Sequence, residues 1–132
     1  MKLSVPVSVG ELLDKISILE IKQQKIKDKS KHANIKHELV LLLSVLRDSE
    51  IEDAICPKIL AELRLKLKLA NEMLWDVEED LRLMEAKEQF DTNFIVAARS
   101  VYKHNDYRAE LKHQLNRLSG SEIVEEKYYS GK

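Results

Sequence analysis

Residues 57–88, PKILAELRLKLKLANEMLWDVEEDLRLMEAKE, decide the fold. Their apolar residues alternate spacings of three and four without a break: Leu60, Leu63, Leu67, Ala70, Leu74, Val77, Leu81 and Met84. A 3.5-residue repeat sustained over this length is typical of a long helix with a coiled-coil-like seam. Pro57 suits the first turn of such a helix, because the N–H that it lacks has no helical partner there. We therefore predict a helix over residues 57–88.

Two shorter helices are predicted before this seam. Ser8-x-x-Glu11 is a capping box, in which each side chain can accept a hydrogen bond from the other residue's backbone N–H. The apolar spacing behind it extends a helix over residues 9–28. Ser30 is the predicted cap of a second helix over residues 31–48, whose centre is apolar on every side.

A fourth helix is predicted over residues 92–119. Asp91 or Thr92 can cap its start, and Gly120 is a natural helix stop. Residues 2–7 alternate in polarity and contain a proline, which favours a short extended arm. The fold expected for residues 1–132 is a single all-α domain. It is a four-helix bundle built from two antiparallel helical hairpins, with short extended N- and C-terminal arms.

Composition restricts the class of protein. The chain has 132 residues and a formal charge of −1, and 44% of its residues are apolar, so we expect one packed core and no polyanion partner. No aromatic residue interleaves the lysines of residues 22–36, so a nucleic-acid surface is not expected. Cys56 is the single cysteine, and no apolar stretch reaches the roughly 18 residues of a membrane span. We expect a cytoplasmic protein without a cofactor.

The predicted helix lengths suggest an oligomer. At 1.5 Å per residue the helices over 57–88 and 92–119 are roughly 45 and 40 Å long, whereas the first two are about 30 Å long. A short hairpin leaves part of a longer one uncovered. A second copy of the chain is the simplest cover, most often through two-fold symmetry, so we expect a homodimer.

Polar residues interrupt the seam of the last helix. After Val101 the seam positions are Asn105 and Arg108. Tyr102 flanks them on the same helix. Folding this helix back on the previous one brings Trp75 and Glu78 to the middle of the bundle beside them and places Arg99 opposite Arg82. One interpretation is a structural pair that fixes register, with Arg108 bound to Glu78, Glu20 or Glu38. The other is a pocket in which Arg108 binds an anionic or carboxylate-bearing ligand.

Two charged residues on the first helix are further ligand-binding candidates. Lys15 and Glu20 lie beside its apolar stripe, and Glu38 of the next helix is expected near Glu20. Solvated surface charges are the simpler explanation of these residues, and we favour it. No metal site is predicted, because the one Glu110-x-x-His113 pair lies off the seam and has no second copy.

Three stretches are similar to an uncharacterised family of short helical bacterial and phage proteins. They are PVSVGELLDKISILEIK (6–22), FIVAARSVYKHNDYRAELKHQLN (94–116) and GSEIVEEKYY (120–129). With the Trp75 region, the resemblance covers nearly the whole chain. The family is a domain of unknown function, so the resemblance names no reaction. Its members resemble cytoplasmic accessory proteins, and the resemblance implies the same for this chain. The motif positions matched here are Asp14, Lys15, Glu20, Arg99, Tyr102, Asn105, Asp106 and Arg108.

Two functions are consistent with these observations. The first is a homo-oligomeric helical interaction module that recruits a protein partner. The second is a small-molecule binding protein or enzyme whose site lies inside the bundle around Arg108. We favour the interaction module over an enzyme, since no catalytic motif is present.

Overall fold

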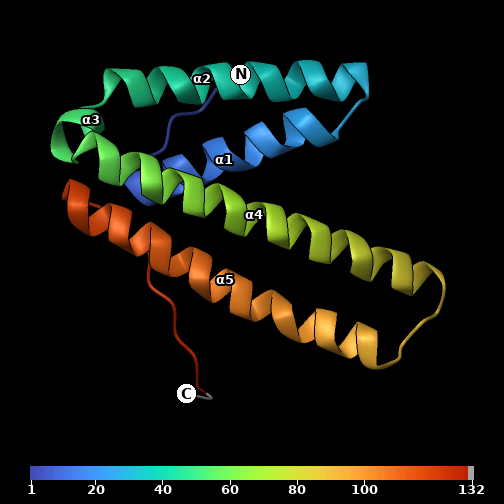
Figure 1. The fold of residues 1–132 in the computed structure, drawn as a ribbon. Helices are drawn as coiled ribbons and strands as arrows, with labels where there is room; N and C mark the ends of the chain where they lie inside the picture. Colours follow the sequence, from blue (N-terminus) through green and yellow to red (C-terminus); the bar gives the residue numbers. More distant parts are fainter. Residues whose placement is uncertain (131–132) are drawn as a thin grey trace.

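A computed structural model describes residues 1–130, which contain five helices and no strand (Figure 1). The all-helical prediction is therefore confirmed. The helices are α1 (Val9–Lys25), α2 (Lys29–Asp48), α3 (Ile51–Ala54), α4 (Pro57–Ala86) and α5 (Thr92–Ser119).

The turn between α1 and α2 comes earlier than predicted. Ile26 has extended backbone angles and ends α1 at Lys25, not at residue 28. Asp28 then caps α2, because its carboxylate accepts a hydrogen bond from the backbone N–H of Lys31 at 2.9 Å. The prediction of Ser30 as this cap is wrong. An aspartate two residues earlier offers a charged acceptor to the same free N–H groups, so the helix begins at Lys29.

The other helix ends follow the sequence signals closely. Asp91 caps α5 by accepting from the N–H of Phe94 at 3.2 Å, and Gly120 ends the helix with a φ of 67°. Helix α4 ends at Ala86, two residues early, and Glu88 then adopts a φ of 53° in the turn. The one-turn helix α3 was not predicted; Ile51 and Ile55 anchor it by burying their side chains in the core.

Helix α1 lies at the centre of the fold. It packs against α2, with which it forms one hairpin, and also against both α4 and α5, which form a second, longer hairpin (Figure 1). Eight residues of α1 are buried, on several sides of the helix. The core combines Leu13 and Ile16 of α1 with Leu39 of α2, Leu67 of α4 and Leu115 of α5.

The core occupies only one half of the long hairpin. The last buried residue of α4 is Leu74, and the first of α5 is Leu111. Between them, residues 75–110 form the distal hairpin, in which no residue is buried. The cause is length: α1 has 17 residues, whereas α4 and α5 have 30 and 28, so α1 covers one half of them only.

Gly10 sets how closely α1 approaches α5. A Cβ atom at this position would lie 2.6 Å from the backbone oxygen of Lys112 and 3.0 Å from the Oδ1 atom of Asn116. The same Oδ1 atom accepts a 2.7 Å hydrogen bond from the Gly10 N–H, which has no partner within the helix. The absence of a side chain therefore allows this contact.

We predict that Gly10→Ala destabilises the protein by about 1–3 kcal/mol, because the added methyl group meets backbone atoms that cannot move aside. This is opposite to the usual gain of about 0.5–1 kcal/mol for replacing a helical glycine by alanine. Urea denaturation gives the free energy of unfolding. Lys15→Ala, at an exposed position of the same helix, is the control and should stay within about 0.5 kcal/mol. A stabilised Gly10→Ala would contradict the close packing.

Candidate functional site

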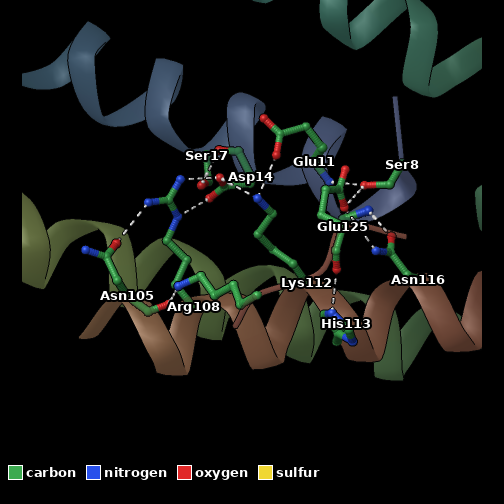
Figure 2. A network of polar contacts seen from close by, with 12 residues as sticks. Ser8, Glu11, Asp14, Ser17, Asn105, Arg108, Lys112, His113, Asn116 and Glu125 are labelled. Carbon is green, nitrogen blue, oxygen red and sulfur yellow. Dashed lines mark hydrogen bonds and ion pairs between the residues drawn. The ribbon is translucent and has the colours of Figure 1, made fainter. Parts of the chain in front are cut away.

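A buried ion pair joins α1 to α5. Asp14 of α1 has a side chain that is only 1% exposed, and Arg108 of α5 approaches it side-on (Figure 2). The Nε atom donates to Oδ1 at 3.0 Å and the Nη2 atom donates to Oδ2 at 2.6 Å. Two parallel charge-assisted hydrogen bonds of this kind give both strength and a defined orientation.

Further polar groups complete the surroundings of Asp14. Asn71 of α4 donates to Oδ1 of Asp14 at 2.8 Å and to the hydroxyl of Ser17 at 2.7 Å. The Ser17 hydroxyl in turn donates to the backbone oxygen of Asp14 at 2.8 Å. Lys112 of α5 lies 3.6 Å from Oδ2 of Asp14 and 2.6 Å from the carboxylate of Glu11. The Asp14 carboxylate thus connects three helices.

The environment keeps Asp14 ionised. Burial by itself raises the pKa of this carboxyl group, but the hydrogen bonds from Arg108 and Asn71 and the charges of Arg108 and Lys112 outweigh it, so the pKa lies below its ordinary value. The pKa of Arg108 is raised in turn, first by its hydrogen bonds to Asp14. Both groups are charged at neutral pH.

A second part of the network holds the C-terminal tail against the start of α1. The Ser8 hydroxyl accepts from the Glu11 N–H at 3.0 Å, as a helix cap does, and donates to Glu125 at 2.7 Å (Figure 2). The ring of His113 donates to the backbone oxygen of Glu125 at 2.8 Å. Only half of the predicted capping box forms, because the Glu11 carboxylate binds Lys112 instead of returning to Ser8.

Four of the predicted site residues do come together. Arg108 and Asn105 of α5 line one cavity of about 220 Å³ with Trp75 and Glu78 of α4. The Nη1 atom of Arg108 donates to Oδ1 of Asn105 at 3.3 Å. This cavity lies where α1 ends against the long hairpin, and Lys22 of α1 also lines it.

The other four candidates lie elsewhere. Tyr102, Arg99 and Lys15 are exposed and do not line this cavity. Glu20 faces a different cavity of about 290 Å³, where it forms ion pairs with Arg64 and Lys68 of α4 at 4.0 and 3.5 Å.

The partner predicted for Arg108 was wrong. Its carboxylate is Asp14, not Glu78, Glu20 or Glu38. The prediction treated α1 as having one buried stripe, whereas α1 is central and buries a second one. Gly10, Asp14, Ser17 and Ile21 follow spacings of four, three and four, and all four are buried. That spacing was the signal that could have placed Asp14 inside.

The chemistry available to this network is restricted. Both carboxylate oxygens of Asp14 already accept hydrogen bonds within the protein. Asp14 is therefore poorly placed to take a proton from a substrate. Within residues 1–130, no fully buried side-chain nitrogen or oxygen lacks a hydrogen-bond partner, and no group of three or more His, Cys, Asp or Glu side chains is arranged to hold a metal ion. Among the same residues, no helix is both long and apolar enough to cross a membrane.

Comparison with known proteins identifies a family. Residues 1–132 match the family described as "Family of unknown function (DUF6165)". The chain belongs to this family. No curated protein and no solved structure matches the chain. The resemblance inferred from the sequence motifs is thus confirmed at the level of an uncharacterised family, and function has to be argued from the structure.

We predict that Arg108→Met lowers the free energy of unfolding by about 3 kcal/mol. The substitution strands a buried carboxylate, and the expected loss is at the lower end for such pairs because Asn71 and Lys112 stay beside Asp14. Chemical denaturation measures it, with Asn105→Leu as the control that should change stability by less than about 1 kcal/mol. An unchanged unfolding midpoint in Arg108→Met would show that the pair is not a structural anchor.

We predict that the ion pair makes stability depend on acid pH. The pKa of Asp14 is lower in the folded protein than in the unfolded chain. At pH values between these two pKa values, the unfolded state therefore binds more protons than the folded state. The contribution of Asp14 is complete above its ordinary pKa of 3.8 and is lost as pH falls through the lower folded value. The free energy of unfolding, measured between about pH 2 and 7, should rise less steeply with pH for Asp14→Asn than for wild type. Equal slopes would mean that Asp14 is not held in its charged form.

Proposed function

We propose that the chain is a homo-oligomeric helical interaction module, most simply a dimer, which recruits a protein partner. We place it in the cytoplasm, where the exposed thiol of Cys56 stays reduced. In this proposal the hairpins α1–α2 and α4–α5 act together as one four-helix bundle, with α1 as the helix in contact with the other three.

The observation that carries the proposal is the uncovered apolar surface of the long hairpin. Nine large apolar side chains on α4, α5 and their connecting turn are between 49% and 62% exposed: Leu65, Leu69, Met73, Leu83, Phe90, Ile95, Val96, Tyr102 and Tyr107. Isolated exposed apolar residues are ordinary, but a concentration of this size on two adjacent helices is typical of an interaction surface.

The polar network supports a structural role over catalysis. Asp14 and Arg108 are each other's main partners, and their neighbours are joined to them or to α1 by hydrogen bonds. An enzyme built here would need at least one group free to exchange a proton or bind a reacting atom. Asp14 is fully engaged, so the network serves as a connection between helices.

A second candidate function is binding of an anionic ligand in the cavity of Trp75 and Glu78. Two cationic side chains, Lys22 and Arg108, line this cavity, and the Arg108 side chain remains 27% exposed at its wall. A carboxylate or phosphate group could pair with them there.

We expect multi-angle light scattering at micromolar concentration to give about twice the chain mass of 15.3 kDa. A single-chain mass would contradict the proposal.

A thermal-shift screen against nucleotides, nucleotide sugars and carboxylates tests the alternative, because a bound ligand raises the unfolding temperature. A shift that Lys22→Met abolishes would establish the ligand site, whereas the interaction module predicts no shift.

A further inference from the structure

Helix α4 has an apolar stripe on the side away from α1. The side facing α1 is marked by Arg64 and Lys68, which pair with Glu20, and by Asn71, which binds Asp14. At 3.6 residues per turn, residues 66, 69 and 73 project from the opposite side of the helix. Leu69 and Met73 are both about half exposed there.

The same surface continues onto α5. On α5 the side facing α1 is marked by Arg108 and Lys112, which pair with Asp14 and Glu11. At 3.6 residues per turn, Tyr107 projects away from that side of the helix. Lys103 and Val96 lie four and eleven residues before Tyr107, which places them on the same stripe of α5. We define the outer face by eight residues, four from each helix: Leu69, Met73, Asp76 and Asp80, with Val96, Arg99, Lys103 and Tyr107.

The two halves of this face carry opposite charge. From Asp76 to Glu85 there are five acidic residues and one base, whereas residues 92–103 contain Arg99 and Lys103 and no acid. In the chain from residue 1 to 130, none of the outer-face charges forms an ion pair. Each helix therefore offers charges that the single chain does not use.

We infer that the outer face is the interface between two copies of this chain, with α4 of each copy against α5 of the other. A two-fold axis parallel to the helices produces this pairing and keeps the contacting helices antiparallel. Asp76 and Asp80 are about as far from the turn at residues 87–91 as are Arg99 and Lys103, so acidic and basic residues meet at the same level. Met73 and Leu69 then meet Tyr107 of the second copy.

The size of the face suits a dimer. Along α4 the stripe of the outer face continues in both directions, from Glu62 to Leu83, which makes it about 30 Å long at 1.5 Å per residue, and two helices make it about 20 Å wide. This flat footprint of roughly 600 Å² corresponds to a larger accessible area once side chains are included, near the roughly 800 Å² per partner of a standard interface. A different protein would have to match both the apolar stripe and the charge pattern. A second copy of this chain matches both, because the two-fold axis brings the acidic α4 of each copy to the basic α5 of the other.

This inference rests on the proposed dimer and is tested by reversing charge on one helix at a time. One variant reverses the acidic pair on α4, with Asp76→Lys and Asp80→Lys. The other reverses the basic pair on α5, with Arg99→Glu and Lys103→Glu. Each should raise the dimer dissociation constant at least about tenfold, because like charges then face each other twice per dimer. The combined variant should return to within about threefold of wild type. Analytical ultracentrifugation over a concentration series gives the constants, and circular dichroism checks folding.

Two controls separate this interface from other surfaces. Val40→Ser, at an exposed apolar position of α2, should leave the dissociation constant unchanged, whereas Met73→Ser should raise it at least about tenfold. A wild-type chain that stays monomeric up to about 100 µM would overturn both the dimer and this interface. A dimer that ignores both charge reversals, or that the combined variant does not restore, would overturn this interface alone and place the contact elsewhere.

Discussion

The rest of the structure depends on the burial of one carboxylate. Asp14 loses almost all contact with water, and a charge in that position is tolerated only with a cation and hydrogen bonds around it. Arg108 can supply the cation only when α5 lies at one height and one rotation relative to α1. Asn71 sets the same condition for α4. Apolar contacts would accept several alignments of three helices, whereas this network accepts one, which is the best-attested use of buried polar groups.

The same alignment fixes the start of α1 and the end of the chain. Once Arg108 binds Asp14, one helical turn further along α5 brings Lys112 to Glu11, and the next brings Asn116 to the N–H of Gly10. These contacts need a short distance between the helix axes, which the missing side chain of Gly10 provides. The tail then reaches Ser8 through Glu125. A row of polar pairs thus runs between two helices that a purely apolar seam would have left free to slide.

The sequence was sufficient for the helices but not for the rotation of α1. The heptad spacing predicted one seam over residues 60–84; its positions from Leu60 to Leu74 are buried, whereas Val77, Leu81 and Met84 are only partly buried. Folding α5 back on α4 placed Arg108 and Asn105 near Trp75 and Glu78, which line one cavity with them. Those positions follow from distance to a turn, which a sequence contains. Predicting the positions of Lys15 and Glu20, and the partner of Arg108, required knowing instead which sides of α1 are covered by other helices. That is a property of three other helices, and the buried stripe containing Asp14 looks polar when read alone.

Helix α4 carries two stripes with the same spacing. The inward one, from Leu60 to Leu74, is covered by α1 and α5, while the outward one repeats at 62, 66, 69, 73, 76, 80 and 83 and mixes charged with apolar residues. A helix face that only met water would gain nothing from leucine and methionine at 69 and 73, since polar side chains would be better solvated there. A face that was permanently buried within the chain would not carry unpaired aspartates at 76 and 80. A face that two chains share satisfies both conditions, because its apolar centre is covered and its charges find partners of opposite sign.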